Sequence, residues 1–258
     1  MLVVGKSVTY TDNIREYDQG VLTGKGLTYG GSLARTQATG FGIIYFVEEM
    51  LKEAGKTING QTVVISGAGN VAIYAVKKAQ ELGAKVVAMC DSSGYIFDED
   101  GIDLPLVQQI KEIERKRIKE YAVRKPSAKY FEGNKGIWTV KADVVIPCAT
   151  QNEIDLNDAK IIVENGTFAV GEGANMPCTN EAEQYFLEKG ILLAPSKAAN
   201  AGGVATSALE MTQNSMRLSW SFEEVDEKLH GIMVNIFKNT RDAAKEYGFE
   251  GNYLVGAN

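Results

Sequence analysis

The sequence has few of the residues that several kinds of active site require. It holds one histidine, His230, and three cysteines, Cys90, Cys148 and Cys178, none of which forms a Cys-x-x-Cys pair. A single histidine argues against a multi-histidine metal site or a histidine-based triad, and we expect His230 to have a surface or packing role on a helix. An odd number of unpaired cysteines is typical of reduced intracellular thiols, and neither a disulfide framework nor a zinc site is expected. We predict no metal site.

Long apolar runs and excess positive charge are also missing. No stretch approaches the roughly 18 apolar residues of a membrane span, and the apolar run that opens the chain is too short for a signal peptide. The net charge of −6 argues against nucleic acid or an anionic membrane as a partner. With 258 residues, 45% of them hydrophobic and 23% charged, the chain is typical of a globular, cytoplasmic enzyme or binding domain.

A glycine-rich turn between a strand pattern and a helix pattern is the most informative feature that is present. Residues 63–66 are small or β-branched, Gly67-Ala68-Gly69-Asn70-Val71-Ala72 follows, and apolar residues then recur at helical spacing. In a dinucleotide-binding turn Gly67 permits the tight bend, Gly69 lets the backbone approach a pyrophosphate, and Ala72 lets the helix sit close to the strand. A purely structural turn is the alternative.

Strand and helix patterns alternate along most of the chain. Strands are predicted at 61–66, 85–90, 143–147, 167–171 and 190–194, and helices at 38–54, 69–82, 103–123, 156–164, 179–188, 202–216 and 221–247. The last helix opens with a capping-box pattern at Ser221 and Glu224. This alternation predicts an α/β fold: a doubly wound, mostly parallel sheet of Rossmann type with extra flanking helices. We interpret residues 1–20 as a lead-in segment and 21–258 as one dinucleotide-binding domain.

Small polar loops follow every predicted strand, and such loops meet at one edge of a doubly wound sheet. Asp91 lies 24 residues after Gly67, where an acid that contacts the adenosine ribose is expected and would favour NAD. Ser92 and a basic group on the next helix could instead hold the 2′-phosphate of NADP. The basic residues available are Lys111, Arg115, Lys116 and Arg117. A solvated helix face remains the alternative for these cations.

Five segments together resemble glutamate dehydrogenases of the hexameric microbial type. They are residues 23–32 (TGKGLTYGGS), 35–42 (RTQATGFG), 147–152 (PCATQN), 172–177 (EGANMP) and 197–211 (KAANAGGVATSALEM). The resemblance runs in order over residues 21–258 and extends to the wider Glu/Leu/Phe/Val dehydrogenase family. It implies oxidative deamination of L-glutamate to 2-oxoglutarate and ammonia, by hydride transfer to a nicotinamide coenzyme, in a homohexamer.

The resemblance also implies roles for individual residues. It places the coenzyme against Arg35, Thr39, Gly67, Ala68, Gly69, Asn70, Val71, Asp91, Ser92, Ala149, Thr150, Gln151, Asn175 and Asn200. It places the side-chain carboxylate of the substrate at Ser207, with Val204 beside it. Ser207 also favours glutamate over other amino acids, and its role rests wholly on the resemblance.

Two differences from the family qualify these expectations. Glu114 stands where NADP-preferring relatives place a lysine, although Arg115 or Arg117 could substitute, so we favour NADP and leave NAD or use of both open. The family's catalytic lysine, proton-transferring aspartate and Gly-Gly-Gly-Lys-Gly-Gly run belong to an N-terminal domain that nothing here matches, and Lys25 lies in a different motif.

We therefore interpret the chain as the C-terminal coenzyme-binding domain alone. It would carry no catalytic residue of its own, would lack the family's closing helix after Gly256-Ala257-Asn258, and would be inactive by itself. A dehydrogenase of leucine, phenylalanine or valine, or a non-catalytic dinucleotide-binding module, are the alternatives.

Overall fold

A seven-stranded sheet forms the centre of the molecule, in the order β4-β3-β2-β1-β5-β6-β7. The computed structural model describes residue 20 and residues 22–258, so the predicted lead-in at 1–20 lies outside the described residues except for Gly20. The strands are β1 (Thr62–Ile65), β2 (Lys85–Asp91), β3 (Gly94–Phe97), β4 (Lys129–Glu132), β5 (Val144–Ile146), β6 (Ala169–Gly171) and β7 (Leu192–Ala194). All neighbouring pairs are parallel except β2–β3 and β3–β4. The predicted mostly parallel sheet is confirmed.

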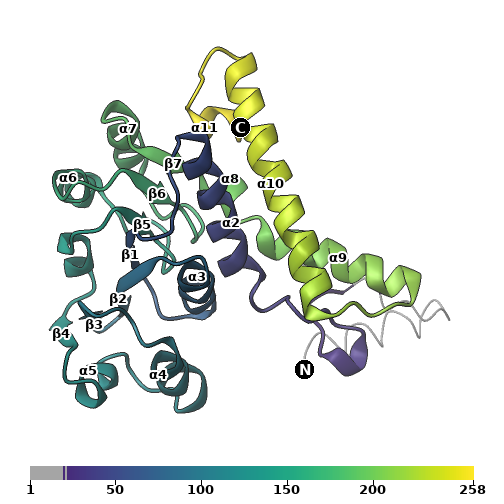
Figure 1. Ribbon diagram of the computed structural model, residues 1–258, viewed down its shortest axis with the longest axis horizontal. Coiled ribbons are helices and arrows are strands. Elements are labelled where there is room, and N and C mark those ends of the chain that lie inside the picture. The colour runs from purple at the N-terminus through teal and green to yellow at the C-terminus, as the bar shows by residue number, and fades with distance from the viewer. Residues whose placement is uncertain (1–19, 21) are drawn as a thin grey trace.

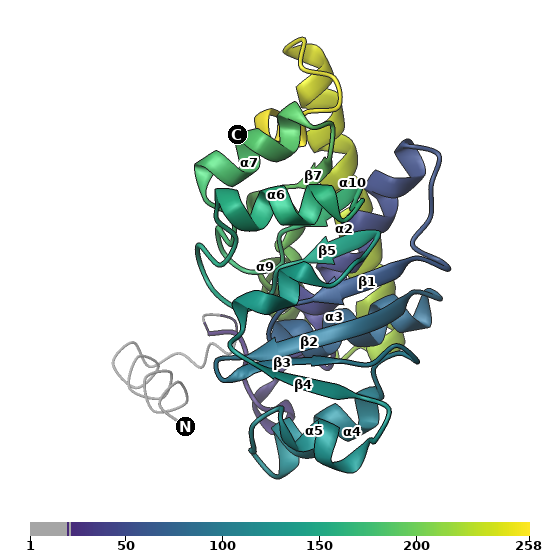
Figure 2. The same cartoon turned by 90° about the vertical axis from the view of Figure 1, so that its left-hand side faces the viewer.

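Helices cover both faces of this sheet (Figures 1 and 2). One face carries α2 (Ala38–Glu53), α3 (Asn70–Glu81) and α10 (Phe222–Glu246); the other carries α6 (Leu156–Glu164) and α7 (Asn180–Glu188). The remaining elements are η1 (Leu27–Tyr29), α4 (Leu104–Gln108), the π-helical η2 (Gln109–Ile113), α5 (Glu120–Arg124), η3 (Lys135–Thr139), α8 (Ser196–Ala199), α9 (Gly202–Met216) and α11 (Tyr253–Gly256).

The strands divide their side chains between two cores, as alternation along a pleated strand requires. Val63 and Ile65 of β1 join the core beneath α2, α3 and α10. Val64, between them, joins the core beneath α6 and α7. Because both faces are buried, these strands read as continuous apolar runs in the sequence.

Two glycines let α2 approach its neighbouring helices closely. A Cβ on Gly40 would lie 2.6 Å from the backbone nitrogen of Ala75 in α3. A Cβ on Gly42 would lie 2.9 Å from the Cα of Gly202, the first residue of α9. The positions of α3 and α9 against α2 are therefore set by backbone packing.

The predicted capping box at the start of α10 is confirmed. Ser221 Oγ accepts a hydrogen bond from the Glu224 backbone N–H at 3.2 Å, and Glu224 Oε2 accepts one from the Ser221 N–H at 2.7 Å. Two backbone donors that the helix cannot satisfy internally are thus paired.

The single helix predicted at 103–123 is wrong. The chain forms α4, one π-helical turn and, after a break, α5, with Arg115 in the left-handed region at φ 54°. The carboxylate of Asp91 accepts hydrogen bonds from the Ile118 N–H at 2.8 Å and from Lys111 Nζ at 3.2 Å. These contacts with the end of β2 prevent a continuous helix. Helical periodicity in the sequence gives no sign of them.

The antiparallel edge of the sheet was also not predicted. Gly94–Phe97 turns back from β2 after the two residues Ser92 and Ser93, and Lys129–Glu132 pairs beside it. The glycine here has little room: a Cβ on Gly94 would lie 2.2 Å from the carbonyl oxygen of Phe131. The stretch after Asp91 is therefore a β-hairpin, where the sequence pattern suggested a loop.

Candidate functional site

The predicted loops meet at the carboxyl edge of the parallel strands. After β1 the chain crosses to α3 on one face of the sheet, and after β5 it crosses to α6 on the other. The boundary between β1 and β5 is thus the point where the winding direction changes, and ligands of doubly wound sheets bind at such a point.

Of the two glycines in the turn after β1, the fold requires Gly67 but not Gly69. Gly67 has φ +86°, and a Cβ there would lie 3.2 Å from the carbonyl oxygen of Cys148, so the fold itself demands glycine. Gly69 has φ −92°, and a Cβ there would meet no atom within 4 Å. Nothing in the described structure requires glycine at position 69, which is the position where the dinucleotide-binding pattern expects a phosphate to approach.

The N-terminus of α3 opens directly above this turn. Its N-cap is Gly69, which supplies no side-chain hydrogen bond to the first turn. Asn70 donates from Nδ2 to the carbonyl oxygen of Thr36 at 2.6 Å and so ties the turn to the segment before α2. Unpaired N–H groups at the start of a 12-residue helix favour an anion.

A cleft of about 820 Å³ lies at this edge of the sheet. It is lined by Arg35, Thr39, Val71, Cys148, Ala149, Thr150, Gln151, Gly173, Ala174, Asn175, Lys197, Asn200, Ala201, Gly203, Val204 and Ser207. Among these residues Arg35 and Lys197 are cations, and none is aspartate, glutamate or histidine. The lining therefore suits an anionic ligand with amide and hydroxyl groups.

The structure brings together most of the residues that the sequence assigned to the coenzyme and the substrate. Arg35, Thr39, Val71, Ala149, Thr150, Gln151, Asn175, Asn200, Val204 and Ser207 all line the cleft. The other predicted positions, Gly67, Ala68, Gly69, Asn70, Asp91 and Ser92, lie outside this lining, on the turns that follow β1 and β2. Gly67 donates its N–H to Cys90 Sγ at the end of β2 at 3.1 Å, which joins these two turns.

Two side chains that the sequence did not single out fix the loop after β5. Ser66 Oγ accepts the Cys148 N–H at 2.8 Å. Glu153 Oε1 accepts the N–H groups of Ala149 at 2.9 Å and Thr150 at 3.3 Å. Burial raises the pKa of Glu153, although the hydroxyl of Ser66 and these N–H groups oppose the shift. This wall of the cleft is thus a loop held by hydrogen bonds, and Glu153 accepts two of them from the loop's own backbone.

A second buried carboxylate fixes the loops after β6 and β7. Glu172 is fully buried and accepts the N–H of Ser196 at 2.8 Å and of Cys178 at 3.3 Å. Asn200 donates from Nδ2 to Asn175 Oδ1 at 2.8 Å across the same gap. A glutamate placed directly after the buried residues of a strand was the available sequence signal for this role.

At the end of β2, Asp91 is held as a paired carboxylate. Burial alone would raise its pKa, but the Ser93 hydroxyl, the Ile118 and Ser93 N–H groups and Lys111 outweigh burial and lower the pKa to about 2. Beside it, Arg117 donates from Nη1 to Ser92 Oγ at 2.6 Å. The guanidinium of Arg117 therefore lies beside Ser92, the hydroxyl that the sequence predicted to hold a 2′-phosphate.

Glu114 does not act as a free negative charge beside this group. Arg124 donates to both of its carboxylate oxygens, at 2.7 and 2.6 Å, and Lys116 lies 3.1 Å away. Arg124 chiefly, with Lys116 and Gln109, lowers the pKa of Glu114. The residue that departs from the NADP-preferring pattern is thus neutralised locally.

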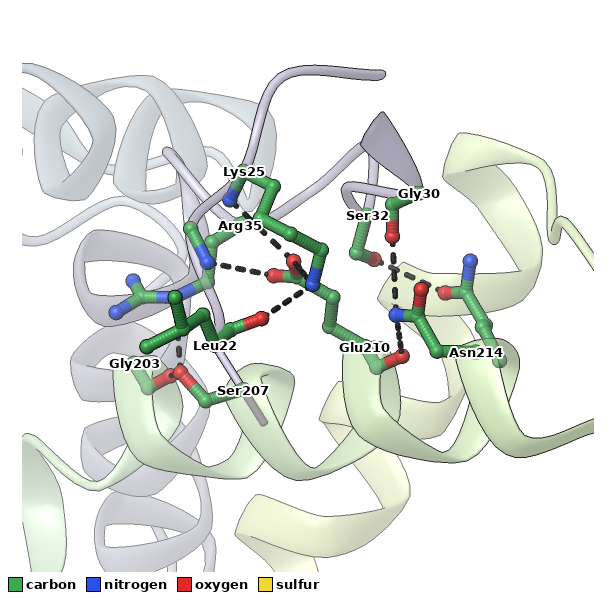
Figure 3. Close-up of polar contacts among 11 residues, drawn as sticks. Leu22, Lys25, Gly30, Ser32, Arg35, Gly203, Ser207, Glu210 and Asn214 are labelled. Carbon is green, nitrogen blue, oxygen red and sulfur yellow. Dashed lines mark hydrogen bonds and ion pairs between the residues drawn. The ribbon is translucent and has the colours of Figure 1, made fainter. Parts of the chain in front are cut away.

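On the opposite wall Arg35 meets α9 (Figure 3). Arg35 donates from Nε to Ser207 Oγ at 3.0 Å, and Ser207 Oγ donates in turn to the Gly203 carbonyl oxygen at 3.2 Å. A Cβ on Gly203 would lie 2.6 Å from Thr39 Oγ1, so glycine permits this close approach. Val204, one residue along, is 70% exposed.

The histidine is exposed on α10, whereas the three cysteines are buried. The ring of His230 lies 4.5 Å from that of Tyr45, which agrees with the predicted surface or packing role on a helix. All three thiols are free and buried, and burial raises the pKa of Cys90 to about 12. Within residues 20 and 22–258, no three His, Cys, Asp or Glu side chains gather to hold a metal ion. In the same residues no helix is both long and apolar enough to cross a membrane.

Taken together, the sheet order, the glycine turn and the cleft are those of a Rossmann-type α/β protein. The family model of the Glutamate/Leucine/Phenylalanine/Valine dehydrogenases matches residues 30–258, and the chain belongs to that family.

Similar proteins agree with this assignment. An NADP-specific glutamate dehydrogenase of Helicobacter pylori is 52% identical over 246 residues, covering 93% of this chain and 55% of its own length. An NAD(P)-specific glutamate dehydrogenase of Xylanibacter ruminicola is 54% identical, covering 93% and 54%. The solved structure of the Plasmodium falciparum glutamate dehydrogenase has a TM-score of 0.93 at 44% identity, covering 97% of this chain and 54% of the other. The chain spans about half the length of the relatives it matches.

Proposed function

We propose that this chain is the coenzyme-binding part of a glutamate dehydrogenase that uses NADP. The observation that carries the proposal is Gly69, which the fold does not require and which lies at the uncapped N-terminus of α3. Supporting evidence comes from the anion-compatible cleft beside this turn and from relatives named as NADP-specific or NAD(P)-specific glutamate dehydrogenases.

The residues divide the coenzyme between them in the proposed complex. Gly67, Ala68, Gly69, Asn70 and Val71 would hold the pyrophosphate, with Asp91 and Ser92 at the adenosine ribose. Ala149, Thr150, Gln151, Asn175, Asn200, Arg35 and Thr39 would surround the nicotinamide half. When bound, the coenzyme accepts a hydride from the substrate. The residues of this chain position it and supply hydrogen-bonding partners along the cleft, neutral ones together with the cation Arg35.

The preference for NADP rests on the charges around Ser92. Asp91 would repel a 2′-phosphate, but its charge is already paired with Lys111 and with two N–H groups. Arg117 is free of a carboxylate partner among the described ion pairs and reaches Ser92. A guanidinium and a hydroxyl together form a suitable pair of donors for a phosphate.

The substrate and assembly belong to the whole protein. We propose that Ser207 and Val204 contact L-glutamate or 2-oxoglutarate from the α9 side of the cleft, with ammonia as the other reactant. The groups that transfer protons would come from the half of the relatives that this chain does not match. A structural relative from Thermus thermophilus is described as a hetero-hexamer, at 28% identity and a TM-score of 0.86, and we propose a homohexamer for the full protein here.

Calorimetric titration of the chain with NADP and with NAD tests the proposal. We expect NADP to bind more tightly, and Arg117→Met to weaken NADP by about tenfold to a hundredfold while NAD changes little, because an arginine–phosphate pair is lost. The matched control is Arg241→Met, which removes a surface ion pair with Glu53.

The glycine turn gives a second, independent arm of this titration. Gly69→Ala should leave thermal stability unchanged, since its Cβ meets open space, yet weaken both coenzymes by roughly tenfold or more. Binding of both coenzymes to Gly69→Ala with wild-type affinity would show that the turn is structural only. An absence of binding to the wild type would overturn the proposed function.

A further inference from the structure

A buried ion pair joins the segment before α2 to helix α9 (Figure 3). Lys25 Nζ lies 2.8 Å from Glu210 Oε1, and the two side chains are 5% and 0% exposed. Glu210 also accepts the backbone N–H of Gly24 at 2.8 Å and of Lys25 at 3.3 Å, and Lys25 Nζ donates to the carbonyl oxygen of Leu22. Glu210 thus gathers three donors from one short piece of chain.

The same piece of chain ends at the cleft. We name residues 22–37 the strap. Its contacts with α9 follow one face of that helix at intervals of three or four residues. Glu210 holds Gly24 and Lys25, Gln213 accepts from Ser32 Oγ at 3.1 Å, and Ser207 accepts from Arg35 Nε at 3.0 Å.

The strap is too tightly folded for its two ends to move independently. A Cβ on Gly31 would lie 2.0 Å from the carbonyl oxygen of Lys25, and the Gly31 N–H bonds to the Gly26 carbonyl oxygen at 3.2 Å. Asn214 Nδ2 donates to the Gly30 carbonyl oxygen at 3.0 Å from the α9 side. A displacement of Lys25 is therefore transmitted to the turn that leads into Arg35.

The start of α9 is held against α2 independently of this ion pair. The close backbone approach of Gly42 to Gly202 already fixes α9 against α2, as described above. A buried carboxylate that binds an ammonium and two N–H groups instead specifies one position of the strap, since any other position leaves a buried charge unpaired. The ion pair therefore fixes the position of the strap, and the strap carries Arg35 into the cleft.

We infer that Glu210 and Lys25 are positioning residues that hold Arg35 against Ser207 in the cleft. Neither residue lines the cleft, so they act through the strap. This inference rests on the proposed function, because it assigns a role to Arg35 in coenzyme binding.

Nuclear magnetic resonance of the 258-residue chain measures the effect directly. The side-chain Nε–Hε signal of Arg35, assigned by its loss in Arg35→Met, reports the bond to Ser207. We expect Glu210→Gln to shift or broaden this signal. Lys52→Met is the matched control, since it removes a lysine–glutamate pair that is on the surface of α2, and it should leave the signal unchanged.

Coenzyme affinity separates positioning of Arg35 from a purely structural role. Glu210→Gln should weaken NADP by about tenfold in the wild-type background and have no further effect in the Arg35→Met background, as expected for residues that act through one another. Equal weakening in both backgrounds, or an unmoved Arg35 signal with unchanged affinity, would overturn the inference.

A second variant covers the case in which Glu210→Gln does not fold. Lys25→Met keeps the two backbone N–H bonds to Glu210, and it should shift the Arg35 signal and weaken NADP in the same pattern. If the wild-type chain binds neither coenzyme, the proposed function fails, and the Arg35 signal alone then decides whether Glu210 positions the strap.

Discussion

Glu183 on α7 is an ionisable residue whose surroundings favour its neutral form. Partial burial, the charge of the fully buried Glu172 and a hydrogen bond to that carboxylate raise the pKa of Glu183 from 4.5 to about 7. The fold therefore favours protonated Glu183. The stability that this group contributes is fully present below about pH 4.5 and is lost as the pH rises through about 7.

Glu183→Gln should remove that pH dependence. Because the side chain is only half-buried, we expect a difference of about 1–2 kcal/mol after allowance for solvent screening. Chemical denaturation should show the variant more stable than wild type at about pH 9 and equal to it at about pH 4. Glu181→Gln, at an exposed position of the same helix, is the control. A wild-type pH profile that the substitution leaves unaltered would contradict the assignment.

Among the elements, α10 depends most clearly on one local motif. It is 25 residues long, and Ser221 and Glu224 pair reciprocally at its start. Ser221→Ala should destabilise the fold by about 1 kcal/mol, because the Glu224 N–H loses its acceptor. Thermal melting should fall by about 2–4 °C, and Ser219→Ala, at an exposed position just before the helix, should have little effect. Equal melting of the two variants would show that the capping box contributes nothing measurable.

The elements that the sequence predicted well are those whose signals are local. α6 and α9 begin and end at the predicted residues, and α10 begins at its predicted cap. Between 104 and 124 the structure departs from the predicted helix, because Asp91 binds Lys111 and the Ile118 N–H, which are distant from it in sequence. Helical periodicity does not report such a contact, so it could not predict the break at Arg115. It also could not predict β3 and β4, which form the antiparallel edge of the sheet.

The whole molecule explains why most of the site could nevertheless be predicted. In a doubly wound sheet the loops after parallel strands must share one edge, so small polar loops in order along the chain imply one cleft. What the sequence could not show is how the loops are held, since Glu172 and Glu210 accept hydrogen bonds from residues far away in sequence and Glu153 accepts them from within its own loop. All three look like ordinary glutamates in the sequence, and only the fold shows that Glu172 and Glu210 are fully buried.

The composition of the cleft leads to a prediction for the chain as a whole. Amino-acid oxidation by a nicotinamide coenzyme needs groups that accept and donate protons. The described lining offers Arg35, a buried Cys148 whose pKa is raised well above its usual range, and Lys197, whose Nζ lies 2.8 Å from Asn258 Oδ1. We expect the 258-residue chain to bind NADP without oxidising L-glutamate.

Two measurements on one sample separate binding from turnover. At a coenzyme concentration about a hundred times the dissociation constant, binding should stabilise the fold by about 2.7 kcal/mol and raise the melting temperature by roughly 5–10 °C. Absorbance of the reduced nicotinamide should not rise after glutamate is added to this chain. The glutamate dehydrogenase of Helicobacter pylori is the positive control, for which the absorbance should rise. Coenzyme reduction at a rate comparable to that control would mean that the catalytic groups lie within this chain, because the cleft would then contain a proton-transferring residue that its described lining does not reveal.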